Sequence, residues 1–180
     1  MGAVFINYLS LLNPTMVEVQ ENTKGNGRRV IKDSPLAEIT MRKYEMPYDT
    51  GERELLKKFC LSVGLLQPGD SRDIIVDVLH VLLLGKKNRE MLDSEKIKRM
   101  TIELRKNESL PLSGVASSNI RRQLKRLREL QLVEKVKNQY RITEFDEMLK
   151  TFEEKVENFI LPSITKRVKE YFKEIDKKFF

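Results

Sequence analysis

The chain has 180 residues and a formal net charge of +7 at pH 7, with 40% hydrophobic and 34% charged residues. This length suits one domain with extensions, and the hydrophobic fraction is sufficient for a core. The basic excess favours an anionic partner, with nucleic acid ahead of an acidic membrane surface. The longest apolar run is too short for a membrane span, so we expect no membrane partner.

The chain has a single cysteine, Cys60, and a single histidine, His80. A single cysteine excludes an intramolecular disulfide and a cysteine zinc cluster, and its apolar surroundings predict a buried structural thiol. We therefore expect a cytoplasmic protein, associated with the nucleoid if the source is a prokaryote. His80 lies in the most apolar predicted helix, so we expect a core histidine. The chain lacks the residue spacing of a phosphate-binding loop. Its carboxylates alternate with lysines along the predicted helices, as they do on solvated helix faces. We therefore expect no enzyme activity, catalytic residue, metal or cofactor.

Residues 1–50 are predicted to be an N-terminal extension that is partly flexible, because residues 20–35 are rich in Gly, Asn and charge. Arg28 and Arg29 lie in this part of the chain. Two alternatives stay open for them: contact with a phosphate backbone or minor groove, or a solvated segment without a partner.

Apolar spacing predicts helices over residues 51–66, 72–84 and 95–106. The second of these is apolar on nearly all sides, so we expect it at the centre of the core. Gly85 is expected to end that helix, and Ser94 is expected to cap the next one.

Residues 117–142 carry eight basic and two acidic residues, a net charge of +6. The first half is predicted to be a helix capped by Ser117 or Ser118, with Ile120, Leu124, Leu127 and Leu130 near one face. Two short β-like pieces follow, separated by a tight turn at residues 137–139. A helix of this kind can dock on a core and still present cations outward, which suits the major groove of DNA.

The stretch SSNIRRQLKRLRELQLVEKV resembles the recognition helix and wing of ArsR- and MarR-type winged helix-turn-helix regulators. The resemblance covers residues 72–142 and rests on the apolar positions Leu124, Leu127, Leu132 and Val133. It implies transcription regulation by a DNA-binding protein, usually a dimer. Gln131 stands where this family usually has glycine, so either the helix exit differs or the chain tolerates a small strain.

The residues predicted to bind DNA share a polar or basic side chain on this helix or on the hairpin after it. They are Ser117, Ser118, Asn119, Arg121, Arg122, Lys125, Arg126, Lys135, Lys137 and Arg141.

Residues 143–180 have an apolar repeat typical of long helices, with Pro162 at a kink or in the first turn of a second helix. Nine acidic and eight basic residues leave this part of the chain nearly neutral. It is predicted to be a dimerisation element, although packing on its own domain is the alternative. The residues of this predicted interface are Phe145, Met148, Leu149, Phe152, Val156, Phe159, Ile160, Ile164, Val168 and Tyr171.

The sequence therefore predicts a mostly α fold with a small β-hairpin, in which residues 51–142 form a winged helix-turn-helix domain. The predicted function is sequence-specific binding of double-stranded DNA by a homodimeric transcription regulator. The alternatives are a winged-helix protein-interaction module in a nucleic-acid complex, or a replication or plasmid-maintenance DNA-binding protein. Phe152 and Phe159 have two interpretations: they line a small-molecule effector pocket together with the core helix, or they are plain core or dimer interface.

Overall fold

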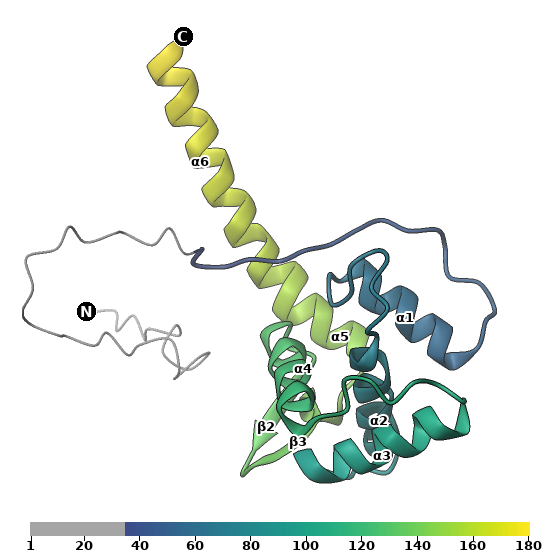
Figure 1. Cartoon of the computed structure of the whole chain (residues 1–180). Helices are drawn as coiled ribbons and strands as arrows, with labels where there is room; N and C mark the ends of the chain where they lie inside the picture. The colour runs from purple at the N-terminus through teal and green to yellow at the C-terminus, as the bar shows by residue number, and fades with distance from the viewer. Residues whose placement is uncertain (1–34) are drawn as a thin grey trace, which may run out of the picture. The chain divides into compact units, whose positions relative to one another are not determined.

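Helices make up most of residues 35–180, the part of the chain that the computed structural model describes (Figure 1). The elements in chain order are α1 (Glu52–Ser62), α2 (Ile74–Lys87), β1 (Leu92–Asp93), α3 (Ser94–Asn107), α4 (Ser117–Glu129), β2 (Val133–Val136), β3 (Gln139–Ile142), α5 (Met148–Phe152) and α6 (Leu161–Phe179). The predicted mostly α class with a small β-hairpin is confirmed. Arg28 and Arg29 lie outside the described residues.

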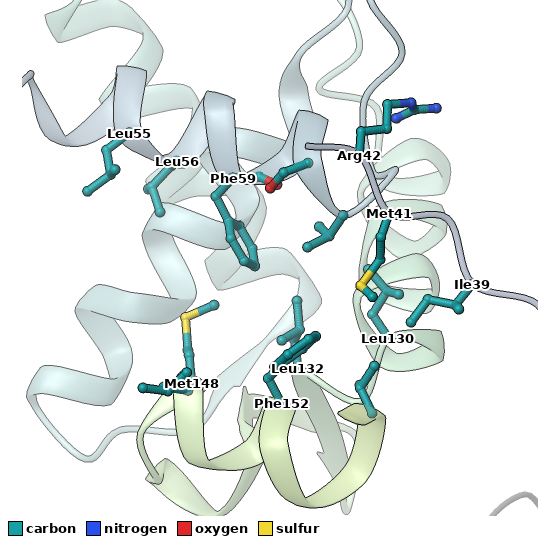
Figure 2. Close-up of a pocket in the computed structure, with 14 residues that line it drawn as sticks. Ile39, Met41, Arg42, Leu55, Leu56, Phe59, Leu130, Leu132, Met148 and Phe152 are labelled. Carbon is teal, nitrogen blue, oxygen red and sulfur yellow. The ribbon is translucent and has the colours of Figure 1, made fainter. Parts of the chain in front are cut away.

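Residues 35–50 form an extended segment that is attached to the body of the fold. The Arg42 backbone N–H donates to the Ser62 carbonyl at 2.7 Å, and the Arg42 guanidinium donates to the Leu61 carbonyl at 3.0 Å. Thr40 packs on Gly64, where φ is +73° and an added Cβ would lie 2.6 Å from the Thr40 Cβ, so this contact requires glycine. The segment forms one side of an apolar groove beside α1 (Figure 2).

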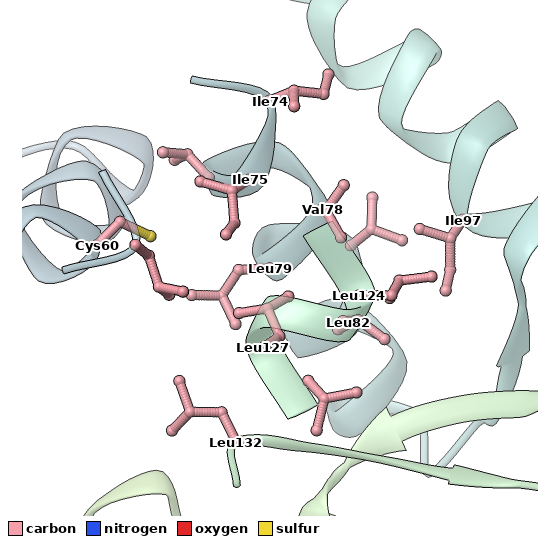
Figure 3. Packing of buried hydrophobic residues seen from close by; sticks show 14 of the residues in the cluster. Cys60, Ile74, Ile75, Val78, Leu79, Leu82, Ile97, Leu124, Leu127 and Leu132 are labelled. Carbon is pink, nitrogen blue, oxygen red and sulfur yellow. The ribbon is translucent and has the colours of Figure 1, made fainter. Parts of the chain in front are cut away.

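The α2 helix forms the centre of the core, as its apolar sequence predicted (Figure 3). Ile75, Val78 and Leu79 are at most 1% exposed, and side chains from α1, α3 and α4 surround them. Gly85 does not end this helix, contrary to the prediction. It lies inside α2, where a Cβ would come within 3.1 Å of the Glu90 carbonyl oxygen, so its small size lets the chain return closely after the helix.

A buried cluster of charges joins α1, α2 and α3. Asp77 is 2% exposed and Arg105 is 3% exposed, and their side chains form an ion pair. Arg53 bonds to Asp77 at 2.9 Å and to Asp73 at 2.7 Å, and Arg105 reaches Asp73 at 3.2 Å. Buried charges are tolerated when each has a partner, so the cluster fixes these three helices relative to one another.

The sheet has three antiparallel strands in the order β1-β3-β2. The β2–β3 hairpin was predicted, whereas the two-residue strand β1, which pairs Leu92 with Tyr140, was not. Asp93, not Ser94, caps α3: its carboxylate accepts hydrogen bonds from the backbone N–H groups of Glu95 and Lys96. These bonds, led by the one from Lys96, hold the pKa of Asp93 below its ordinary value.

The C-terminal part is one long helical run. A π-helical segment, Glu153–Ile160, connects α5 to α6, and the backbone stays helical at Ile160 and Leu161. Pro162 lies in the first turn of α6, where its missing N–H is best tolerated next to the wide π turn. None of the α6 residues is buried by residues 35–180.

Candidate nucleic-acid interface

The α4 helix docks on the core through one apolar face. Ile120, Leu124 and Leu127 are 0% exposed, and they contact the core that α2 and α3 also line. Leu130, the fourth predicted docking residue, packs against this core while half-buried. The docking face of the helix is therefore confirmed, and the opposite face is left for cations.

The exit of α4 has the geometry that the glycine of the resembled family would adopt. Gln131 has φ of +61°, which is left-handed. The Leu132 N–H donates to the Leu127 carbonyl and the Gln131 N–H donates to the Arg128 carbonyl, the bonding pattern of a Schellman helix end. Of the two alternatives for Gln131, the structure shows the strained one.

The first turn of α4 presents backbone N–H groups and short polar side chains. Ala116 is the N-cap residue, so the expected cap by Ser117 or Ser118 is wrong, and no side chain of residues 35–180 caps this helix. Ser117 accepts a hydrogen bond from Lys98 at 3.0 Å. Asn119 donates to the Gly114 carbonyl at 2.7 Å and accepts from Arg122 at 2.9 Å, so it orients its neighbours.

Four cations lie on the outward side of α4. The Arg121 side chain is 60% exposed and the Lys125 side chain is 74% exposed. Arg122 and Arg128 are also exposed. The ion pairs of Arg121 with Glu95 at 3.4 Å and of Lys125 with Glu129 at 3.8 Å are long and solvated, and such pairs are weak. These cations can exchange their present partners for phosphate.

Arg126 is placed differently from the other predicted contact residues. It is half-buried, and its guanidinium donates to the Leu65 carbonyl at 2.5 Å and to the Gln123 side chain at 3.0 Å. It therefore ties α4 to the loop after α1. Helical periodicity predicted on which side of α4 the Arg126 side chain lies, but it could not predict that the loop after α1 packs against this side.

The β2–β3 hairpin carries the other predicted cations. Lys137 and Asn138 form the two-residue turn with φ of +47° and +67°, and both are exposed. Lys135 is exposed beside the Tyr140 ring. Arg141 forms an ion pair with Glu134 at 2.6 Å, so Lys135 and Lys137 are the hairpin cations with less compensation.

A polar hollow of about 550 Å³ lies at the start of α4. Arg72 and Arg122 line it together with Ser113, Ser118 and Asn119. Arg72, which precedes α2, was not among the residues predicted to bind DNA. No local pattern connects it to α4, because the two meet only through the packing of α2 against α4.

The predicted dimerisation residues divide into three groups by burial. Val156 is 3% exposed and Met148 packs against the core, so both already have contacts within the protomer. Phe145, Phe152, Ile160 and Ile164 are half-buried. The rest are large apolar side chains in solvent: Leu149, Phe159, Val168 and Tyr171.

An apolar groove of about 580 Å³ lies between the extended segment, α1, the end of α4 and the C-terminal helical run. Figure 2 shows Leu55, Leu56 and Phe59 of α1 facing Met148 and Phe152 across it. Phe152 was considered as a pocket residue from the sequence and lines this groove, whereas Phe159 does not. The residues that line the groove come from segments far apart in the chain, so hydrophobic periodicity could not predict the groove.

Two kinds of feature are missing from residues 35–180. No three or more His, Cys, Asp or Glu side chains gather there in a way that could hold a metal ion. No helix there has the length and apolar character needed to cross a membrane. Comparisons of the chain with protein-family models, curated proteins and solved structures found no match.

Proposed function

We propose that residues 51–142 form a winged helix-turn-helix domain that binds duplex DNA, with α4 in the major groove and the β2–β3 hairpin on the adjacent backbone. Two features support this assignment. The elements follow one another along the chain as α2, β1, α3, α4, β2 and β3, and the antiparallel sheet has the strand order β1-β3-β2. In such domains the second helix of the pair enters the groove and the hairpin flanks it.

The observation that carries the proposal is the outward face of α4. Arg121, Arg122, Lys125 and Arg128 are exposed there, and Glu129 is the only acidic residue of the helix. Each cation that neutralises a phosphate releases counterions, so a face of this charge favours a polyanion. A surface that recognises a protein has no need for so large a charge excess.

Arg122 is the best placed of these cations. It lies in the first turns of α4, it lines the polar hollow with Arg72, and Asn119 holds its guanidinium. Ser118 and the free N–H groups of the first turn lie beside it, and such groups bind phosphate oxygens. Arg126 belongs to the fold in this proposal and is not counted among the DNA contacts.

We further propose that the protein acts as a homodimeric transcription regulator. The C-terminal run carries a row of exposed apolar residues and is nearly neutral in total, whereas residues 117–142, which include α4 and the hairpin, have a net charge of +6. A protein with this separation can bind DNA and a second copy at the same time. A protein-interaction module in a nucleic-acid complex is the competing function.

Binding of a fluorescent random-sequence duplex tests the proposal. At about 50 mM salt, where phosphate contacts are strong, we expect measurable affinity that falls steeply as salt is added. Changing both Arg122 and Lys125 to Ala should weaken binding by about tenfold or more, because two exposed cations of α4 are lost.

The matched control removes two exposed lysines of α6, Lys166 and Lys169, by the same substitution. It changes the net charge equally and should leave most of the affinity intact. An equal loss of affinity in both variants would show that binding depends on net charge alone and not on the α4 face. Absence of binding by the wild-type protein would support the interaction module.

A further inference from the structure

We infer that the C-terminal helical run pairs with the same run of a second copy in antiparallel orientation, with Ile164 at the two-fold axis. The end of α6 of each copy then closes the apolar groove of the other. This inference deepens the dimer of the proposed function and rests on that part of it, but it does not rest on DNA binding.

The first observation is that one apolar stripe continues from the groove along α6. Apolar residues recur at every fourth position from Phe152 to Phe172: Phe152, Val156, Ile160, Ile164, Val168 and Phe172. In an α-helix such a stripe drifts by roughly 40° at each step, because 3.6 residues make a turn. The wider π turn between Glu153 and Ile160 reduces this drift, so α6 continues the face that lines the groove.

The second observation is that the outer part of this stripe has no cover from residues 35–180. Val168 is 46% exposed and Phe172 is 62% exposed, and Ile175, the next apolar residue along α6, is 49% exposed. Figure 1 shows α6 extending away from the helices α1 to α4. Apolar stripes of this extent mark an interaction surface.

The third observation is that the groove leaves no polar group for a polar ligand. Arg42 at its rim already donates to the carbonyls of Leu61 and Leu66 and to the Gln67 side chain. Ser62 donates its hydroxyl hydrogen to the Phe59 carbonyl. The groove therefore suits apolar side chains such as those of α6.

The stripe is complementary to itself about Ile164. In an antiparallel pair centred there, residues whose numbers differ equally from 164 lie opposite each other. Ile160 then faces Val168 of the second copy, and Leu149 faces Phe179 of the second copy. Phe172 of the second copy lies opposite Val156, a groove-lining residue that is only 3% exposed, so this pair adds little new contact. Apart from Phe152, which lies opposite Asp176 of the second copy, the apolar residues of the stripe thus meet apolar residues along a run of 30 residues, or about 45 Å.

Charge selects the antiparallel orientation. Residues 144–157 contain six acidic and two basic residues, a net charge of −4, and residues 166–178 contain six basic and three acidic residues, a net charge of +3. An antiparallel pair brings each acidic half beside the basic half of the other helix. A parallel pair would bring like charges together, and this costs free energy.

Cysteine cross-linking in the full chain, without DNA, tests the orientation and the register. Ile164→Cys should form an intermolecular disulfide in most molecules under mild oxidation. Ile160→Cys and Val168→Cys should not do so singly, because two copies of either residue would lie about 12 Å apart along the helices, beyond the reach of a disulfide. The double variant with both cysteines should cross-link.

A second double variant, Leu149→Cys with Phe179→Cys, tests closure of the groove. These two positions are about 45 Å apart within one helical run, so a disulfide between them must join two copies. The wild-type protein is the control: Cys60 is 0% exposed, and burial raises the pKa of its thiol to about 12, so it should not react.

Three results would overturn the inference. Cross-linking of all three single variants would show a parallel pair. Sedimentation of the wild-type protein as a monomer at every concentration would leave the groove to another occupant. A wild-type dimer in which neither Ile164→Cys nor the Leu149 and Phe179 double variant cross-links would place the interface elsewhere. A failure of DNA binding alone would change none of these readouts.

Discussion

Gln131 shows how one residue can bear strain for the sake of geometry. Its left-handed backbone turns the chain from α4 into β2, and its carbonyl accepts a hydrogen bond from the Thr143 hydroxyl at 2.7 Å. A residue with a Cβ is disfavoured by about 1 kcal/mol or more in this conformation, whereas glycine is not. The chain therefore leaves α4 with a left-handed backbone at position 131 although glutamine is unfavourable in that conformation.

Replacing Gln131 therefore gives a clean stability prediction. Gln131→Gly should raise the free energy of unfolding by about 0.5–1 kcal/mol over Gln131→Ala, because only glycine relieves the strain and this gain exceeds its extra entropy in the unfolded chain. Urea unfolding at one protein concentration measures both variants.

The same pair of substitutions at Arg128, inside α4, is the control. There alanine should be the more stable residue, since glycine weakens a helix interior by about 1 kcal/mol. If alanine is also the more stable residue at position 131, the left-handed backbone does not cost what the geometry of this helix exit implies.

Individual residues also show what sequence patterns can and cannot predict. The buried positions of α4 followed from spacing alone, because periodicity reports which side of a helix is apolar. The role of Arg126 did not follow, because its carbonyl partner at Leu65 is 61 residues away in the chain. Arg72 was missed for the same reason.

At the scale of elements, the charge cluster of Arg53, Asp73, Asp77 and Arg105 connects three helices. Burial alone would raise the pKa of Asp73, but hydrogen bonds from Arg53 and Arg105 outweigh it and hold this pKa below its ordinary value. A carboxyl group with a lowered pKa in the folded state stabilises the fold above the unfolded pKa of about 3.9. That contribution is lost as the pH falls through the lower, folded value.

Asp73→Asn should therefore change how stability depends on pH. At pH 7 the variant should be less stable by about 1–3 kcal/mol, because Arg53 and Arg105 lose a charged acceptor. Below pH 4 or so its stability should fall less steeply than that of the wild type, because one shifted carboxyl group is gone. Urea unfolding at a series of pH values measures both effects.

Glu103→Gln is the matched control for the loss of one carboxylate. Glu103 is exposed on α3 and forms no ion pair with the other residues in the range 35–180. Its variant should keep the stability of the wild type at pH 7 within about 0.5 kcal/mol. Parallel pH curves for wild type and Asp73→Asn would show that the cluster does not depend on the Asp73 charge.

Elements differ in how well the sequence predicted them. Helices with a long apolar repeat and the β2–β3 hairpin were predicted, because their patterns span several residues. Strand β1 has two residues and exists only because β3 pairs with it, so no local pattern could reveal it. The groove was likewise hidden, since packing of Ile39, Leu55 and Met148 creates it.

At the scale of the whole molecule, residues 35–180 separate two kinds of surface. A net positive charge is exposed on α4 and at the hairpin turn, and a row of apolar residues is exposed along the C-terminal run, where basic and acidic residues nearly balance. A two-fold pair of C-terminal helices would leave the outward cations of both copies of α4 outside the dimer contact, because the groove includes only Leu130 at the end of that helix. Two α4 helices related by a two-fold axis read a DNA site with the same symmetry.

Selection of bound sequences from a pool of random duplexes tests this central claim most directly. The pool is bound at moderate salt, so that contacts to phosphate alone do not retain every sequence. A sequence-specific dimer predicts strong enrichment of one inverted-repeat consensus by the wild-type protein. The variant that lacks the Arg122 and Lys125 side chains should lose that enrichment. A pool that stays random with the wild-type protein would contradict sequence-specific recognition by α4.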